Sequence, residues 1–249
     1  SDTTAVALAA ELHADVCEIY TDVDGVYTAD PRIVPHARKM EEVTYDEMLE
    51  MASLGAKVLH SRCVEIAKKY GVELLVCSSL NRNSGTMVRE KTKMEKMLIS
   101  GVAADKNVAK IRVAGLGNDP ESTFRLLNLL DRNNLNIDVM IQSLGKDGTK
   151  SVSFTVTKPD MLRTIDVLND NKDSLGIKKL DYDENVAKVS VIGAGVRSHS
   201  GVAAKMFGAL ANAGINTEMV TTSEIRITAL IDEAYADQAM RAIHETFLE

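Results

Sequence analysis

The sequence predicts an α/β protein in which a layered region is followed by a smaller unit that is used twice. Three observations support this prediction. Over residues 1–90, helical stretches alternate with short runs of β-branched and apolar residues. From about residue 97 the order becomes β-α-β-β-α-β, which is the split unit of ferredoxin-like folds. That order then recurs with a period of about eighty residues, which indicates one structural unit used twice.

The overall composition excludes several classes of protein. The 249 residues are enough for two or three domains, and 45% hydrophobic with 26% charged residues is ordinary for a soluble chain. A net charge of −7 argues against a nucleic-acid partner. The sequence contains no run of about eighteen apolar residues, so no membrane segment is expected. Three cysteines without ligand or disulfide spacing indicate buried thiols in a cytoplasmic protein and predict no metal site.

The first region reads as alternating helices and strands. An alanine-rich helix near 3–13, which Ser1 would cap, precedes a buried strand at 16–21. A long loop with glycine and two prolines then follows the carboxyl end of that strand, where open α/β sheets bind ligands. The remaining elements expected here are the loop over 22–39, helices near 44–53 and 55–70, a strand at 72–78 and a turn at 81–86.

Both repeated units can be read element by element from their periodicity. The first is expected to contain strands at 111–117, 136–145, 151–157 and 177–183, with helices at 120–134 and 160–170. The second is expected to contain strands at 189–195, 216–223 and 224–231, with helices at 200–214 and 233–248. The second unit lacks a fourth strand, and a separate strand at 96–105 precedes the first. Because a bare sheet edge is a liability, we infer that 97–104 supplies the missing strand and that the units interleave.

Acidic residues cluster in the loop that follows the first strand. Asp22, Asp24 and Asp30 lie there beside Tyr27 and Arg32. Carboxylates at a strand end commonly organise a metal–nucleotide site, and arginine pairs with phosphate oxygens. Asp-Gly and Asp-Pro steps also favour tight bends by themselves, so turn chemistry is the alternative.

Lys57 and two glycine pairs are weaker signals. Lys57 would lie at the start of a helix, where a phosphate would offset its charge, but a solvated surface lysine is the simpler alternative. The pairs Gly115–Gly117 and Gly193–Gly195 do not complete a dinucleotide-binding fingerprint. They leave strand-to-helix turns whose free backbone N–H groups suit an amino-acid carboxylate, with plain turn geometry as the alternative.

At this point the chain resembles one family, the aspartate kinases, along its whole length. The resemblance lies in SDTTAVALAA, EIYTDVDGVYTADPRIVPHARK, ASLGAKVLHSR and the pair IRVAGLG…NIDVMIQS and VSVIGAG…TTSEIRI. It implies that residues 1–90 are the C-terminal part of an amino-acid-kinase domain with three αβα layers. Two interleaved ferredoxin-like ACT domains would follow, one formed by 106–183 and the other by 97–105 plus 184–249.

The family resemblance also implies an activity. Aspartate kinases phosphorylate the side-chain carboxylate of L-aspartate with ATP and Mg²⁺, giving 4-phospho-L-aspartate on the way to lysine, threonine and methionine. The implied aspartate-binding residues are Ser1 and Asp2. The implied ATP contacts are Thr21, Asp22, Tyr27, Asp30, Arg32, Lys57 and Val58. The chain begins inside structured sequence and lacks the family's glycine loop, so we expect a fragment that is inactive without its N-terminal kinase segment.

Regulation is the other implication of the resemblance. Effector sites in this family lie where ACT units pack together, often between two chains, so a homodimer or larger assembly is expected. The matching residues are Asn118, Asp119, Asn136, Ile137, Asp138, Gln142, Asn216, Thr222, Ser223 and Glu224. Asp138 or Glu224 could hold the ammonium group of lysine or threonine, and ordinary surface charge is the alternative. The first loop reads Asn-Asp-Pro-Glu where the family often has Asp-Lys-Pro-Gly, which puts carboxylate binding there in doubt.

Two other functional classes remain open from the sequence. One is a separately made regulatory subunit, and the other is a stand-alone amino-acid sensor. Neither needs the strand, loop and lysine of residues 1–88 that match an ATP site. The sequence therefore favours the enzyme, without identifying its effector.

Overall fold

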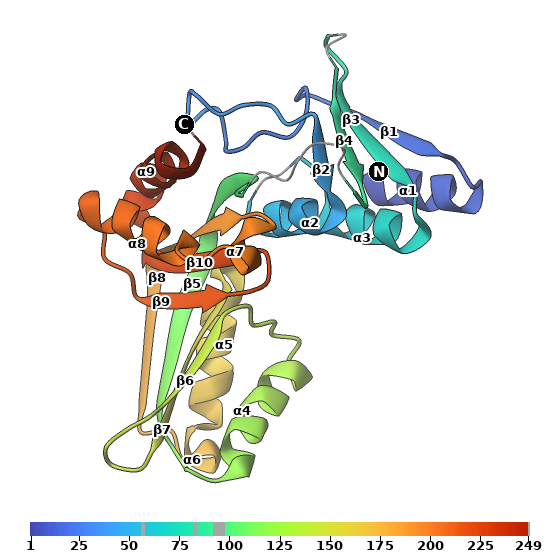
Figure 1. Ribbon diagram of the computed structural model, residues 1–249. Helices are drawn as coiled ribbons and strands as arrows, with labels where there is room; N and C mark the ends of the chain where they lie inside the picture. The colour runs from blue at the N-terminus through green and yellow to red at the C-terminus, as the bar shows by residue number, and fades with distance from the viewer. Residues whose placement is uncertain (56–57, 82–83, 92–97, 249) are drawn as a thin grey trace. The chain divides into compact units, whose positions relative to one another are not determined.

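The computed structural model describes residues 1–55, 58–81, 84–91 and 98–248, which form two compact units (Figure 1). Unit 1 comprises Ser1–Asp105, Lys188–Ile231 and Tyr235–Glu249. Unit 2 comprises Lys106–Ala187 and Asp232–Ala234. The start of the chain and most of the second repeat therefore share one unit, while the first repeat forms the other.

Residues 1–91 form a four-stranded sheet with helices packed against it. In chain order the elements are α1 (Asp2–Glu11), β1 (Val16–Thr21), β2 (Glu42–Thr44), α2 (Tyr45–Ser53), α3 (Ser61–Tyr70), β3 (Glu73–Ser78) and β4 (Thr86–Arg89). The strand order is β1-β3-β4-β2; β1 runs parallel to β3, β2 runs parallel to β4, and β3 and β4 are antiparallel. The three helices lie together along one face of the sheet (Figure 1).

Local sequence signals explain where these helices begin and end. Thr44 and Glu47 form a reciprocal capping box at the start of α2, which satisfies two of its free N–H groups. His60 caps α3 through its ring, and Gly71 ends that helix in the left-handed conformation with φ of 70°. The prediction of a helix from residue 55 was therefore wrong at its start, because Ser61 is the first helical residue. The short strands β2 and β4 were not predicted.

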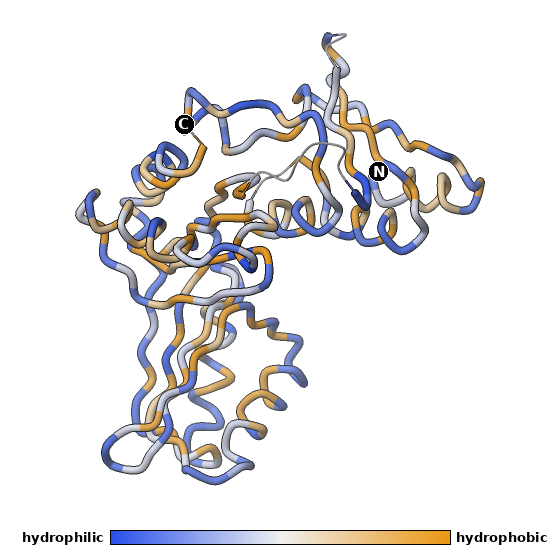
Figure 2. Tube along the Cα trace, viewed as in Figure 1, coloured by the Kyte–Doolittle hydropathy of each residue, from blue (hydrophilic) through white to orange (hydrophobic). Residues whose placement is uncertain are grey.

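The first repeat, most of which is unit 2, contains the β-α-β-β-α-β order expected from the sequence. Its elements are β5 (Gly101–Leu116), α4 (Pro120–Arg132), β6 (Met140–Leu144), β7 (Lys150–Thr157), α5 (Lys158–Asp170), α6 (Lys172–Leu175) and β8 (Lys179–Ile192). The strands lie in the order β6-β7-β5-β8, and β7 pairs antiparallel with both β6 and β5. Hydrophobic and hydrophilic residues alternate along α4 (Figure 2), whose buried side includes Leu126 and Leu130.

The second repeat follows in unit 1. Its elements are α7 (Gly195–Ser198), α8 (Val202–Asn212), β9 (Met219–Thr222), β10 (Arg226–Asp232), a 3₁₀ turn at Glu233–Tyr235 and α9 (Ala236–Leu248). The strand order continues as β5-β8-β10-β9. Strand β5 thus lies beside the first strand of this repeat, in the place that β8 occupies in the first repeat.

Two pairs of predicted strands are in fact single long strands. The strands expected at 96–105 and 111–117 are joined in β5, which begins only at Gly101, so the described residues 98–100 are not in a strand. Those expected at 177–183 and 189–195 are joined in β8, which begins at Lys179 and ends at Ile192. The joining segments, DKNVAK at 105–110 and DENVAK at 183–188, contain polar residues but no glycine or proline to break a strand. Lys188 is buried there and forms an ion pair with Asp105 at 3.2 Å.

The long loop at residues 22–40 shares a hydrophobic core with the second repeat. Ala29 and Val34 from the loop belong to the same buried cluster as Met206, Met240 and Ile243 from α8 and α9. This shared core explains why the first 91 residues and the second repeat belong to one compact unit. We refer to residues 22–40 as the 22–40 loop.

The turn that ends the first helix of each repeat is closely matched. Leu135 N–H donates to Leu130 O at 3.0 Å, and Ile215 N–H donates to Leu210 O at 2.9 Å. Asn134 and Gly214 both take positive φ, at 51° and 71°. The period of eighty residues therefore describes the backbone as well as the sequence.

Candidate functional site

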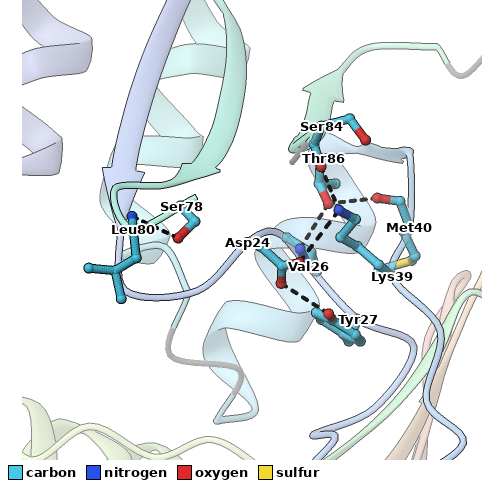
Figure 3. Close-up of polar contacts among 9 residues, drawn as sticks. All are labelled: Asp24, Val26, Tyr27, Lys39, Met40, Ser78, Leu80, Ser84 and Thr86. Carbon is cyan, nitrogen blue, oxygen red and sulfur yellow. Dashed lines mark hydrogen bonds and ion pairs between the residues drawn. The ribbon is translucent and has the colours of Figure 1, made fainter. Parts of the chain in front are cut away.

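The 22–40 loop is closed at its base by one buried hydroxyl group. Thr86 on β4 is fully buried; its Oγ1 accepts from Val26 N at 2.8 Å and donates to Met40 O at 2.6 Å (Figure 3). A Cβ on Gly25 would approach Thr86 Oγ1 to 2.6 Å, so the loop sequence needs glycine there. The two ends of the loop are consequently tied to each other and to the sheet.

A second set of polar contacts organises the same end of the loop. The hydroxyl of Tyr27 donates to Asp24 Oδ1 at 3.0 Å, and Lys39 Nζ lies 3.6 Å from Asp24 Oδ2 (Figure 3). Lys39 also donates to Ser84 O at 2.5 Å. Burial, followed by the hydrogen bond to Asp24, raises the pKa of Tyr27 above its ordinary value. Asp24 is thus held inside the loop rather than facing solvent.

Asp30 and Arg32 form a bidentate pair at the tip of the loop. Arg32 Nη2 lies 2.7 Å from Asp30 Oδ2, and the Arg32 backbone N–H donates to Asp30 Oδ1 at 2.9 Å. The Arg32 side chain is 88% exposed, compared with 28% for Asp30. Hydrogen bonding from Arg32 lowers the pKa of Asp30, so this carboxylate holds the guanidinium in place while it faces solvent.

The other residues expected near the substrates occupy separate elements. Ser1 precedes α1 and donates to Asp2 Oδ1 at 3.1 Å, and Thr21 ends β1 with its hydroxyl donating to Asp22 Oδ1 at 3.1 Å. Val58 is half-buried against the core of unit 1. Lys57 lies outside the described residues.

The three cysteines offer no reactive thiolate near these residues. Burial raises the pKa of Cys63 to about 11, and the charge of Asp2 adds to that shift. Burial also raises the pKa of Cys17 and of Cys77. Cys77 is only half-buried, so the prediction of three buried thiols was wrong for this residue.

The expected effector residues of the first repeat are spread over the ends of α4 and β6. Asn118 is exposed, and Asp119 is the N-cap of α4, accepting from Glu121 N at 2.9 Å and Ser122 N at 2.8 Å. Hydrogen bonding from Ser122 lowers the pKa of Asp119. Gln142 accepts from Thr123 at 2.7 Å. The segment between α4 and β6 carries Asn136, Ile137 and Asp138.

In the second repeat the expected residues lie around the hairpin that joins β9 and β10. Ser223 N–H donates to Arg226 O at 2.7 Å, which closes a tight turn. Glu224, at the tip of that turn, accepts from Arg197 of α7 at 2.9 Å, and both side chains are more than two-thirds exposed. Thr222 ends β9, and Asn216 is exposed in the segment before it. Arg197 was not anticipated from the sequence.

The glycine pair of the second repeat is explained by close packing. A Cβ on Gly193 would meet Ile99 Cα at 2.7 Å, and one on Gly195 would meet Leu98 O at 2.3 Å. The backbone N–H of Gly195 donates to Leu98 O at 3.0 Å. The interpretation that this turn keeps its N–H groups free for a carboxylate was therefore wrong at Gly195, and the glycines instead admit the segment 98–100.

Comparison with known proteins gives the family. A sequence model of the amino acid kinase family matches residues 1–78, and a model of the ACT domain matches residues 189–247. The aspartokinase of Pseudomonas aeruginosa is 46% identical over 99% of this chain. A crystal structure of aspartokinase alpha and beta subunits is 42% identical, covers 60% of this chain and is itself covered to 98%, with a TM-score of 0.57. The chain belongs to the aspartokinase family.

The aspartokinase match extends along the whole chain. Escherichia coli aspartokinase III in complex with aspartate and ADP is 28% identical, with a TM-score of 0.87, and matches 100% of this chain and 56% of its own. The same enzyme with lysine and aspartate is 29% identical, with a TM-score of 0.81, and matches 100% of this chain and 55% of its own. The chain spans 61% of the length of the Pseudomonas aeruginosa aspartokinase.

Sequence reasoning missed two residues that hold the 22–40 loop in place, Lys39 and Thr86. Lys39 contacts Asp24 of the predicted cluster, and Thr86 bonds to Val26, which is 60 residues away in the sequence. A threonine at the start of a short strand has no distinguishing sequence pattern. Lys39 could have been noted, because it is a lysine at the far end of an acidic loop.

Proposed function

We propose that this chain is the C-terminal part of an aspartate kinase that acts in the cytoplasm. The reaction transfers the γ-phosphoryl group of ATP to the side-chain carboxylate of L-aspartate, giving 4-phospho-L-aspartate on the route to lysine, threonine and methionine. The observation that supports this best is the 22–40 loop, whose Asp30–Arg32 pair and buried Thr86 clasp give a fixed shape to the family's nucleotide segment. None of the helices in the described parts of the chain is long and apolar enough to cross a membrane.

Positioning and charge are all that this chemistry requires. An aspartate carboxylate is ionised at neutral pH, so it attacks the phosphoryl group without a general base. In our proposal Arg32, held by Asp30, lies against the phosphate oxygens, while Tyr27 and Thr21 line the nucleotide. Ser1 and Asp2 would contribute to the aspartate site, and Lys57 and Val58 to the ATP site.

The described residues fit a magnesium ion that arrives with the nucleotide. No group of three or more His, Cys, Asp or Glu side chains within them is placed to hold a metal. Asp24 and Asp30 are engaged with Tyr27 and Arg32, whereas Asp22 is exposed at the end of β1. Mg²⁺ is usually bound by one or two carboxylates plus substrate phosphates, so Asp22 is the residue that would contact it.

The kinase proposal is tested by aspartate-dependent turnover. The full-length protein that the gene encodes should release ADP from ATP and Mg²⁺ only when L-aspartate is present, and hydroxylamine should trap the acyl phosphate. Arg32→Ala should lower kcat/KM for ATP more strongly than Lys205→Ala, a control that removes one exposed charge. ATP hydrolysis without aspartate, or no turnover by the full-length protein, would contradict the proposal. The 249 residues alone are expected to be inactive.

We also propose that an amino acid, lysine and/or threonine, binds the repeats and inhibits the enzyme. The hairpin of the second repeat supports this, because exposed Glu224 and Arg197 present one charge of each sign. An effector ammonium group would compete with Arg197 for Glu224, and Ser223 would donate to the carboxylate. Inhibition requires that the effector bind one conformation of the enzyme better than the other.

Effector binding can be measured without activity. A ligand that binds only the folded state raises the melting temperature, so a thermal-shift screen of amino acids identifies the effector. The Ser223→Ala/Glu224→Ala double variant should lose this shift, while Glu245→Ala, which removes a charge from an exposed position of the same repeat, should keep it. An unchanged calorimetric affinity in the double variant would exclude this placement. The first-repeat residues would be tested next, starting with Asp138 and Gln142.

The domain division and the assembly are proposals of the same kind. We assign residues 1–90 to the kinase domain, 106–183 to the first ACT domain, and 97–105 plus 184–249 to the second. Strand β6 is at one end of its sheet and exposes Met140, Ile141 and Leu144, which favours pairing with a second copy. Ile141→Lys should halve the mass measured by light scattering if that edge forms a homodimer.

A non-catalytic regulatory subunit is the second candidate. The regulatory subunit of aspartate kinase from Thermus thermophilus is 33% identical and matches 60% of this chain, with a TM-score of 0.57. The match of residues 1–78 to the amino acid kinase family favours the enzyme instead.

A further inference from the structure

The tip of the 22–40 loop is attached to the C-terminal helix of the second repeat. We propose that His244 on α9 is a positioning residue for the nucleotide loop, acting through Thr28. This inference rests on the proposed function, because it assigns the 22–40 loop to ATP. It adds a residue far from the substrates that sets how tightly ATP is bound.

The contact between His244 and Thr28 is buried and direct. Thr28 Oγ1 lies 2.9 Å from His244 Nε2, and the two residues are 3% and 0% exposed. Thr28 immediately follows Tyr27 and lies two residues before Asp30. A histidine on the final helix therefore bonds to the segment of the loop that carries Tyr27 and Asp30, two of the expected ATP contacts.

The backbone and side chain of Thr28 also form hydrogen bonds to Arg38 in the loop and to Val102 on β5. Its N–H donates to Arg38 O at 2.9 Å, and its Oγ1 accepts from Arg38 N at 3.0 Å. Its carbonyl accepts from Val102 N at 2.7 Å. Thr28 consequently joins the first half of the loop to the second half at Arg38. His244 holds this pair of residues against α9.

A second hydrogen bond holds the second half of the loop, at Arg38, to the same helix. Arg38 Nη2 donates to Leu248 O at 2.6 Å, at the C-terminal end of α9, where unpaired carbonyls favour a cation. Ala29 and Val34 pack into the core that includes Met240 and Ile243. The segment between these anchors carries Arg32, and Ile33 N and Val34 N both donate to Asp30 O, at 3.0 and 2.9 Å.

Because His244 orders the tip of the loop, its loss should weaken ATP binding, whereas a general loss of folding stability should not. Thr86 anchors the base of the loop, whereas α9, together with Val102 of β5, holds the part of the loop around Thr28 and Arg38. Loss of the histidine should leave the protein folded with a less ordered tip. If the competent conformation is then populated about one tenth of the time, the apparent Kd for nucleotide rises about tenfold.

Two substitutions at position 244 separate positioning from folding. His244→Leu fills the space without a polar group, whereas His244→Gln offers an amide at similar reach. In the full-length enzyme, His244→Leu should raise KM for ATP and Kd for ADP about tenfold, with KM for aspartate unchanged. His244→Gln should restore most of that loss. Thr28→Val should reproduce the leucine variant, and Thr28→Ser should behave like the wild type.

Leu168→Ala is the matched control, because Leu168 on α5 is fully buried in the separate core of unit 2, which contains no residue of the 22–40 loop. It should lower the melting temperature at least as much as His244→Leu while leaving KM for ATP unchanged. Equal increases in KM for ATP in both variants would overturn the inference, as would a failure of His244→Gln to restore ATP affinity. If the full-length wild type shows no aspartate-dependent turnover, the proposed function fails. The Kd for ADP in the same variants then decides the role of His244 alone.

Discussion

Thr86 gives the clearest single-residue test of how the 22–40 loop is held. Thr86→Val keeps the shape of a fully buried side chain but leaves Val26 N–H and Met40 O without their partner. We expect the free energy of unfolding to fall by about 1–3 kcal/mol, the cost of buried unpaired groups. Urea denaturation would measure it. Thr86→Ser should be less destabilising, and Thr246→Val, at an exposed hydroxyl, should change stability little; equal losses in Thr86→Val and Thr246→Val would contradict this account.

The Asp30–Arg32 pair predicts a specific acid dependence. Hydrogen bonding to Arg32 holds the pKa of Asp30 below its ordinary value of 3.8, so the pair stabilises the folded state above that pH. This contribution is lost as the pH falls through the lowered, folded-state pKa. In Arg32→Gln, NMR titration should show the pKa of Asp30 rising toward 3.8. An unchanged pKa would mean that the exposed guanidinium does not hold the carboxylate in solution.

At the scale of residues, the sequence identified groups whose chemistry is local. Asp30 and Arg32 are two positions apart, so a turn brings them together whatever the rest of the chain does. Thr86 and His244 could not be found this way, because their partners lie 60 and 216 residues away. A single threonine or histidine on an apolar face gives no sequence signal, because its hydrogen-bond partner comes from a distant part of the chain.

At the scale of elements, the glycines of the second repeat predict opposite outcomes for the same substitution. Gly193→Ala would push a Cβ to 2.7 Å from Ile99 Cα and 2.8 Å from Leu98 O, both backbone atoms, and should cost about 1–3 kcal/mol. Gly208, within α8, has no atom within 4 Å of an added Cβ. Gly208→Ala should therefore be stabilising by about 0.5–1 kcal/mol. Thermal unfolding of the two variants compares them directly, and a neutral Gly193→Ala would disprove the close packing.

Periodicity predicted elements well where each is bounded by its own signals. The strand expected at 16–21 is β1, Val16–Thr21, and both repeats have the helices that the sequence indicates. The pattern failed at β5 and β8, because Lys106 and Asn107 in the first join, and Glu184 and Asn185 in the second, look like loop residues. In β2 and β4, three or four residues are too few to show alternation, and pairing with neighbouring strands makes them strands.

At the scale of the whole molecule, chain order did not predict which parts fold together. The 22–40 loop reads as a surface connection of the first region, since it contains glycine and two prolines. Instead it contributes Ala29 and Val34 to the core of the second repeat, while Arg226 at the start of β10 forms an ion pair with Glu50 of α2 at 2.8 Å. These contacts join segments that are far apart in the sequence, so local sequence patterns cannot predict them.

Amide hydrogen exchange should show that the 22–40 loop opens only together with α9. Thr28, Val34 and Val102 all donate backbone hydrogen bonds at the point where the loop meets the second repeat. Because the loop shares a buried core with Met240 and Ile243, exposing these amides requires separating that core. We expect them to exchange at least about a thousandfold more slowly than an open chain, with the same denaturant dependence as the amides of α9. Lys146, exposed in a turn, provides the fast control. Rapid exchange at Thr28 and Val34, independent of denaturant, would show that the loop moves freely and that α9 cannot set its position.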